Sequence, residues 1–102
     1  MKYYIYNRRL DTNSIDLNCT SLTYNDYTMV YKGDIENEQI VDKILEDIFY
    51  KFQHVEGHNC PDDYAGRSLS VGDVIVLENK YYKMPFVVKG IGFEICNNFF
   101  KD

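Results

Sequence analysis

The chain has no tryptophan, only two prolines and no long uninterrupted run of apolar residues. A membrane-spanning helix needs roughly 20 consecutive apolar residues, so the sequence predicts no membrane partner. The N-terminal stretch MKYYIYNRRL also lacks the apolar core of a secretory signal peptide. We therefore expect a protein that is neither inserted in a membrane nor exported, and we place it in the cytoplasm.

Basic residues are few, because eleven Lys and Arg accompany sixteen Asp and Glu and give a net charge of −5. Binding to nucleic-acid phosphates needs clustered Lys and Arg, so we predict no nucleic-acid partner. The acids gather in residues 33–63, which hold nine of them against two lysines. An acidic mimic of nucleic acid is therefore an alternative function, although −5 over 102 residues is a small charge for that task.

Cysteine is scarce as well, and its pattern indicates no disulfide framework. Cys19, Cys60 and Cys96 are odd in number and widely spaced, which is typical of reduced, partly buried thiols. His54 and His58 with Cys60 have the spacing H-x3-H-x-C, but a structural zinc site needs four ligands. We predict no metal and no cofactor.

Catalytic motifs are also missing: the sequence has no phosphate loop, dinucleotide-binding motif or serine elbow. We therefore predict that the protein is not an enzyme and has no catalytic residue. A small thiol-dependent enzyme using Cys60 and His58 remains an alternative, because a thiol beside a base is what nucleophilic catalysis requires.

Aromatic residues are abundant, with ten Tyr and six Phe in 102 residues. Such residues favour strands, because their rings fit a half-buried pleated surface. In residues 37–54, apolar side chains recur at steps of three and four, which predicts an amphipathic helix. We expect a single domain, residues 1–102, of the α+β class: one long amphipathic helix packed on a curved, mostly antiparallel sheet of about five or six strands. The helix should bury Ile44, Leu45, Ile48 and Phe52.

The stretch 66–77, GRSLSVGDVIVL, is interpreted as architectural. Gly66 should end a helical turn, Gly72 and Asp73 should redirect the chain, and Val74 to Leu77 should form an inner strand, since all four are apolar. Any interaction surface should lie beside this stretch, on residues we expect to be exposed: Tyr64, Arg67, Ser68 and Ser70. Locally, we expect Arg67 to pair with Asp62 or Asp63 or to stack on Tyr64. If these residues form the interaction surface, replacing Arg67 and Tyr64 together by alanine should leave thermal stability nearly unchanged and abolish partner capture.

Four motifs follow one another along the chain: VYKGDI, LEDIFYKFQ, PDDYAGRSLSVGDVIVL and YY…GIGFEI. Their order resembles the YodL-like domain family over roughly residues 27–99. The chain departs from that pattern at Gln53, where Asn is usual, at Arg67, where His is frequent, and at Gly72, where Ser is common. These departures argue against a strict chemistry shared by the family.

The resemblance implies a small cytoplasmic accessory protein of a Gram-positive bacterium or its mobile elements, with no catalytic residues to carry over. Our functional hypothesis is a non-enzymatic protein-binding module, encoded by a mobile element, that modulates a host protein. Its protein partner is not identified by the sequence.

Overall fold

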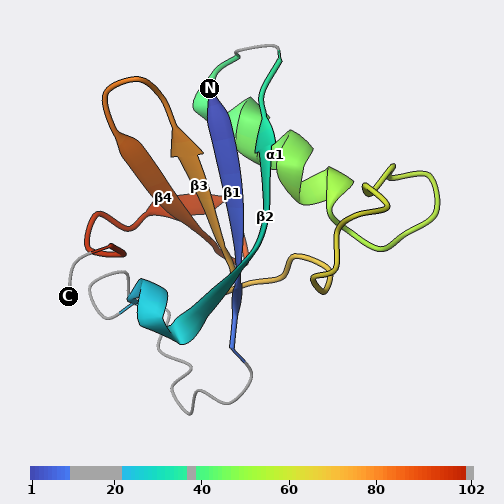
Figure 1. The fold of residues 1–102 in the computed structure, drawn as a ribbon, viewed down its shortest axis with the longest axis horizontal. Coiled ribbons are helices and arrows are strands. Elements are labelled where there is room, and N and C mark those ends of the chain that lie inside the picture. The colour runs from blue at the N-terminus through green and yellow to red at the C-terminus, as the bar shows by residue number, and fades with distance from the viewer. Residues whose placement is uncertain (10–21, 37–38, 101–102) are drawn as a thin grey trace.

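The computed structural model describes residues 1–9, 22–36 and 39–100 (Figure 1). Five strands form one antiparallel sheet in the order β2-β1-β3-β4-β5. The elements, in chain order, are β1 (Lys2–Arg8), the 3-10 helix η1 (Tyr24–Asp26), β2 (Tyr27–Asp34), α1 (Val41–Lys51), β3 (Val74–Glu78), β4 (Lys83–Val88) and β5 (Phe93–Ile95).

The predicted fold class is wrong, because the molecule is mostly sheet and α1 is short. The helix has 11 residues, Val41–Lys51, instead of the predicted span 37–54. Its end has a local cause. The side-chain amide of Gln53 donates to the carbonyl oxygen of Phe49 at 3.0 Å and to that of Leu69 at 2.9 Å. A continuing helix would use the Phe49 carbonyl for the backbone N–H of residue 53, so the side chain replaces that bond and the chain turns away.

Both faces of the sheet are covered, but by different segments. On one face α1 and the segment that follows it pack on the sheet (Figure 1), and the core there includes Tyr3, Ile5, Leu45, Phe52 and Leu77. On the other face a second, smaller core lies under η1 and the C-terminal turn, formed by Leu22, Tyr27, Val74, Val76, Val87, Cys96 and Phe99. Because it lies between these two cores, the centre of the sheet is closed to solvent on both sides.

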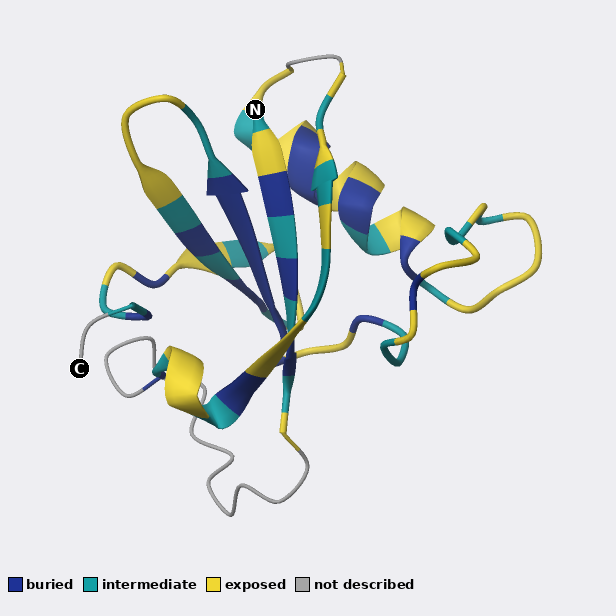
Figure 2. Cartoon of the chain, in the orientation of Figure 1, coloured by how far each residue is buried: buried dark blue, intermediate teal, exposed yellow. Residues whose placement is uncertain are grey.

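β3 is the central strand, as the run of four apolar residues predicted. Val74, Ile75, Val76 and Leu77 each have no exposed surface, and Figure 2 shows β3 as buried along nearly its whole length. The prediction of an inner strand over Val74 to Leu77 is confirmed. Side chains of a strand alternate between faces, so this one strand contributes to both cores.

The buried side of α1 also agrees with the sequence pattern. Ile44, Leu45 and Ile48 are buried, and so is Phe52 just beyond the helix. The Phe52 ring lies 4.9 Å from that of Tyr64 and 5.1 Å from that of Tyr31, between centroids. The apolar repeat therefore identified the correct buried residues, although the helix ends before the last of them. In the described part of the chain, no helix has the length and apolar character that crossing a bilayer requires.

We expect Ile48→Ala to lower the free energy of unfolding by about 2–5 kcal/mol, because it removes a buried side chain and leaves a cavity. Urea denaturation followed by circular dichroism measures this change. Ile40→Ala is the matched control, since Ile40 is 76% exposed next to the same helix and Ile48 only 6%. Equal effects of the two substitutions would contradict the packing of α1 on the sheet.

Candidate functional site

A fully buried carboxylate, Asp73, lies immediately before β3 and accepts hydrogen bonds from two segments of the chain, β1 and the loop of residues 67–70. Arg67 donates to both of its oxygens, from Nη1 at 2.5 Å and from Nη2 at 2.7 Å. The backbone N–H groups of Arg8 and Ser70 add bonds of 2.8 and 3.0 Å, and the Asn7 amide adds one of 3.4 Å. We call these five residues the Asp73 cluster. A buried charge is tolerated only when it is paired and hydrogen-bonded, and here both conditions are met.

The chain reaches this arrangement through two glycines. Gly72 has a φ of 98°, in the left-handed region that favours glycine, and its carbonyl accepts a 2.6 Å bond from the Tyr27 hydroxyl. Gly66 is required by close approach instead, because a Cβ there would lie 2.6 Å from Oδ1 of Asn7. The stretch 66–77 is thus bonded to both β1 and β2.

The four predicted surface residues all have partners within the chain. Tyr64 is buried, and its hydroxyl donates to the Arg67 carbonyl at 2.5 Å. The Ser68 hydroxyl accepts a 2.8 Å bond from the backbone of His54, and that of Ser70 accepts a 3.1 Å bond from Arg67. The predicted pairing of Arg67 with Asp62 or Asp63 is wrong, because its guanidinium binds Asp73. A role of these residues in partner binding stays a prediction.

His54 and His58 form hydrogen bonds with different residues. His54 Nε2 donates to the Gly66 carbonyl at 2.6 Å, and His58 Nδ1 donates to the Tyr50 carbonyl at 2.9 Å. The His58 ring also stacks on that of Tyr50 at 3.8 Å between centroids. Over residues 1–9, 22–36 and 39–100, no three His, Cys, Asp or Glu side chains come together in a group that would hold a metal ion.

The surroundings of Cys60 give little support to thiol catalysis. Cys60 is a free thiol, but burial raises its pKa, so less of the reactive thiolate is present at neutral pH. No hydrogen bond joins the side chains of Cys60 and His58 in the part of the chain that the structure describes. Cys96 is disulfide-bonded, so the prediction of reduced thiols is wrong for this residue, and Cys19 lies outside the described residues.

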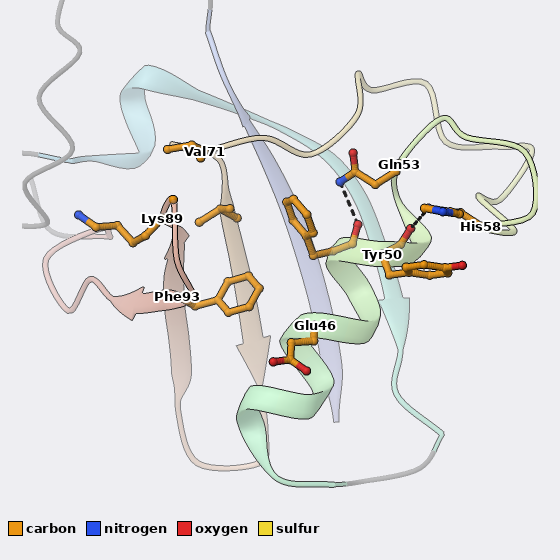
Figure 3. A pocket seen from close by; sticks show the side chains of 11 residues that line it. Glu46, Tyr50, Gln53, His58, Val71, Lys89 and Phe93 are labelled. Carbon is orange, nitrogen blue, oxygen red and sulfur yellow. Dashed lines mark hydrogen bonds between the residues drawn. The ribbon is translucent and has the colours of Figure 1, made fainter.

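An open cleft of about 450 Å³ lies between α1 and the segment joining β4 to β5 (Figure 3). Its interior is apolar and includes Phe49, Val88 and Phe93, and the rings of Phe49 and Phe93 meet edge to face at 6.3 Å. Its other lining residues are Glu46, Tyr50, Gln53 and His58 on the helix side and Val71, Lys89, Gly90 and Gly92 on the other. We call this feature the α1–β5 cleft.

Several exposed apolar side chains surround the α1–β5 cleft. Tyr50 is 56% exposed and Val71 is 48% exposed. Ile91, between the two cleft glycines, is 97% exposed. Exposed apolar side chains that border a groove are a feature of interaction sites.

The sequence did not predict this cleft, because its walls come from segments that are far apart in the chain: residues 46–58, 71 and 88–93. The Gly-Ile-Gly sequence at 90–92 was the one local signal. Because glycine has no side chain, an aliphatic residue between two glycines has no adjacent side chain to cover it.

The architecture is that of a small, mostly β domain, with one antiparallel sheet, one short covering helix and an open apolar cleft. The family model of the YodL-like domain matches residues 4–99, nearly the whole chain, and the protein belongs to this family. The resemblance inferred from the four motifs is therefore confirmed, over a longer span than those motifs cover. No curated protein and no solved structure matches the chain.

The geometry leads us to predict the opposite of the expectation that Arg67 and Tyr64 can be replaced together with little loss of stability. We expect Arg67→Ala to lower the free energy of unfolding by roughly 3–5 kcal/mol, because it leaves the buried Asp73 carboxylate without its countercharge. Lys43→Ala is the control: Lys43 and Asp47 form an exposed pair at 3.1 Å, for which we expect a loss of about 0.5 kcal/mol or less. Chemical denaturation gives both values. A loss below about 1 kcal/mol for Arg67→Ala would show that backbone N–H groups alone stabilise Asp73.

We further expect Tyr27 to contribute to alkaline unfolding. Burial raises its pKa from 10.0 to about 12, and the ionised phenolate can no longer donate to Gly72. Because the pKa is higher in the folded state, this contribution is complete below pH 10.0 and is lost as the pH rises towards about 12. Tyr27→Phe should therefore lessen the fall in stability over this range, measured by denaturation at successive pH values. Tyr81→Phe, at a residue 78% exposed, should not.

Proposed function

We propose that this YodL-like domain is a non-enzymatic protein-binding module and that the α1–β5 cleft is its binding site. The observation that carries the proposal is the combination of an open apolar cleft of about 450 Å³ with exposed apolar side chains around it. Binding pockets typically measure about 300–1,000 Å³ and are lined mainly by apolar and aromatic groups.

The walls of the cleft are held in place before any partner arrives. Gln53 bonds the end of α1 to the Leu69 carbonyl, and the Gly72 N–H donates to the Val88 carbonyl at 2.8 Å. The Val71 side of the cleft is therefore anchored both to the helix and to β4. A preorganised site loses less conformational entropy on binding, which favours recognition of a partner side chain inserted between the walls.

Binding explains the described residues better than thiol catalysis does. A catalytic cysteine needs a base within hydrogen-bond reach and a lowered pKa, whereas the pKa of Cys60 is raised and His58 bonds to Tyr50. The proposal extends to an accessory role, in which the partner is a host protein modulated on behalf of a mobile element. That part rests on the family resemblance alone.

The predicted surface adjoins the cleft through Val71. We propose that Ser68 and Ser70 extend the binding face, since both are at least partly exposed. Tyr64 and Arg67 instead act by holding this loop against the sheet, through the Tyr64–Arg67 and Arg67–Asp73 bonds.

Selection from a phage-displayed library of random peptides tests the proposal. We expect the wild-type domain to enrich a set of peptides and Val71→Gln to bind them about tenfold more weakly or worse, because a polar side chain is placed at the cleft. Met29→Gln is the matched control, since Met29 on β2 is 48% exposed, as Val71 is. It should bind the same peptides as the wild type. Failure to enrich any peptide, or binding that Val71→Gln leaves unchanged, would contradict the proposed site.

A further inference from the structure

We propose that the segment recognised by the α1–β5 cleft is cationic: it inserts an apolar side chain into the cleft and places a Lys or Arg beside Glu46. This inference rests on the proposed protein-binding function and specifies the chemistry of the partner. It is carried by the charges at the cleft, which are not evenly distributed.

Glu46 is the one carboxylate among the residues that line the cleft. Its side chain is exposed and has neither an ion pair nor a hydrogen bond among residues 1–9, 22–36 and 39–100. Figure 3 shows this carboxylate projecting from α1 towards the side of the cleft that carries Phe93. A negative group is thus positioned next to an apolar surface and remains available to a guest.

The one lysine of the cleft does not offset this charge. Lys89 forms an ion pair with Glu94 at 3.3 Å, and Figure 3 shows its side chain running away from α1. The positive charge is therefore already matched, on the side opposite Glu46. A bound segment would contact an apolar surface with the Glu46 carboxylate at one edge.

A second exposed carboxylate lies next to Glu46 on α1. Asp42 lies four residues before Glu46 on α1, and residues four apart are neighbours on one side of a helix. Lys43, three residues before Glu46, is a neighbour as well, but it is paired with Asp47 at 3.1 Å, so the charge beside the cleft stays negative. Complementary charge at the edge of an interface steers association and selects partners, so these carboxylates favour a cationic segment and disfavour an acidic one.

The peptides enriched by the wild-type domain give the first test. We expect Lys and Arg to be more frequent among them than in the unselected library, next to a Leu, Ile, Met or Phe, and Asp and Glu to be rarer. One enriched peptide is then synthesised in two further forms, with its cationic residue replaced by Gln or by Glu, and their affinities are measured by fluorescence anisotropy.

The domain variants separate a local contact from a general effect of charge. We expect Glu46→Gln to weaken binding of the cationic peptide about threefold to fivefold, as for an exposed ion pair. Glu46→Lys should weaken it further and should prefer the peptide that carries Glu. Glu36→Gln is the control, because Glu36 is an exposed glutamate outside the cleft; it changes the net charge equally and should leave affinity unchanged.

The possible failures are distinguishable. Neutral peptides that depend on Val71 but not on Glu46 would overturn the cationic partner and leave the proposed function standing. Equal losses in Glu46→Gln and Glu36→Gln would also overturn it, since the effect would then be one of net charge. A concentration-dependent dimer that Val71→Gln abolishes would make a second copy of the chain the occupant and overturn both proposals, as would a wild-type domain that enriches no peptide.

Discussion

The bidentate bond between Arg67 and Asp73 is the interaction on which the rest of the molecule depends. Asp73 has no exposed surface, yet it stands at the entrance to the central strand, where a charge is costly unless it is fully paired. Its two oxygens hold Arg67 and the backbone of Arg8 and Ser70. The loop before β3 is thereby tied to β1, and β1 and β3 are adjacent strands at the middle of the sheet.

The same loop connects this interaction to the cleft. Between Ser70 and Gly72 the chain exposes Val71, which lines the cleft although its neighbours are engaged in the Asp73 cluster and in the bond to Val88. On the other side, Gln53 ends α1 and bonds to Leu69. The two walls are therefore linked through a few polar contacts, while the surface between them is apolar. A rigid frame around an open apolar floor is suited to binding a side chain of another molecule.

In the part of the chain that the structure describes, His54 and His58 do not form a comparable site. His54 and His58 each bond to a backbone carbonyl, and each ring stacks on a tyrosine, Tyr64 and Tyr50 respectively. These contacts fold the segment after α1 back on itself. They position that segment, and the stacked His58 ring supports Tyr50 in the wall of the cleft.

By itself the sequence determined the buried side of the helix, the inner strand Val74 to Leu77 and membership of the YodL-like family. The helix face and the strand depend on the spacing of apolar residues that are close together in the chain. Family membership depends on the order of four short motifs. Only the tertiary structure decided the rest. The apolar repeat continues through Phe52, but the Gln53 side chain occupies the Phe49 carbonyl oxygen and ends the helix, while the same amide also bonds to Leu69, which is distant in the sequence. Arg67 has acidic residues nearer than Asp73 on its N-terminal side, yet the turn at Gly72 brings Asp73 to it. The cleft unites residues from 46 to 93, and a local pattern carries no information about surfaces that meet only after the sheet has formed.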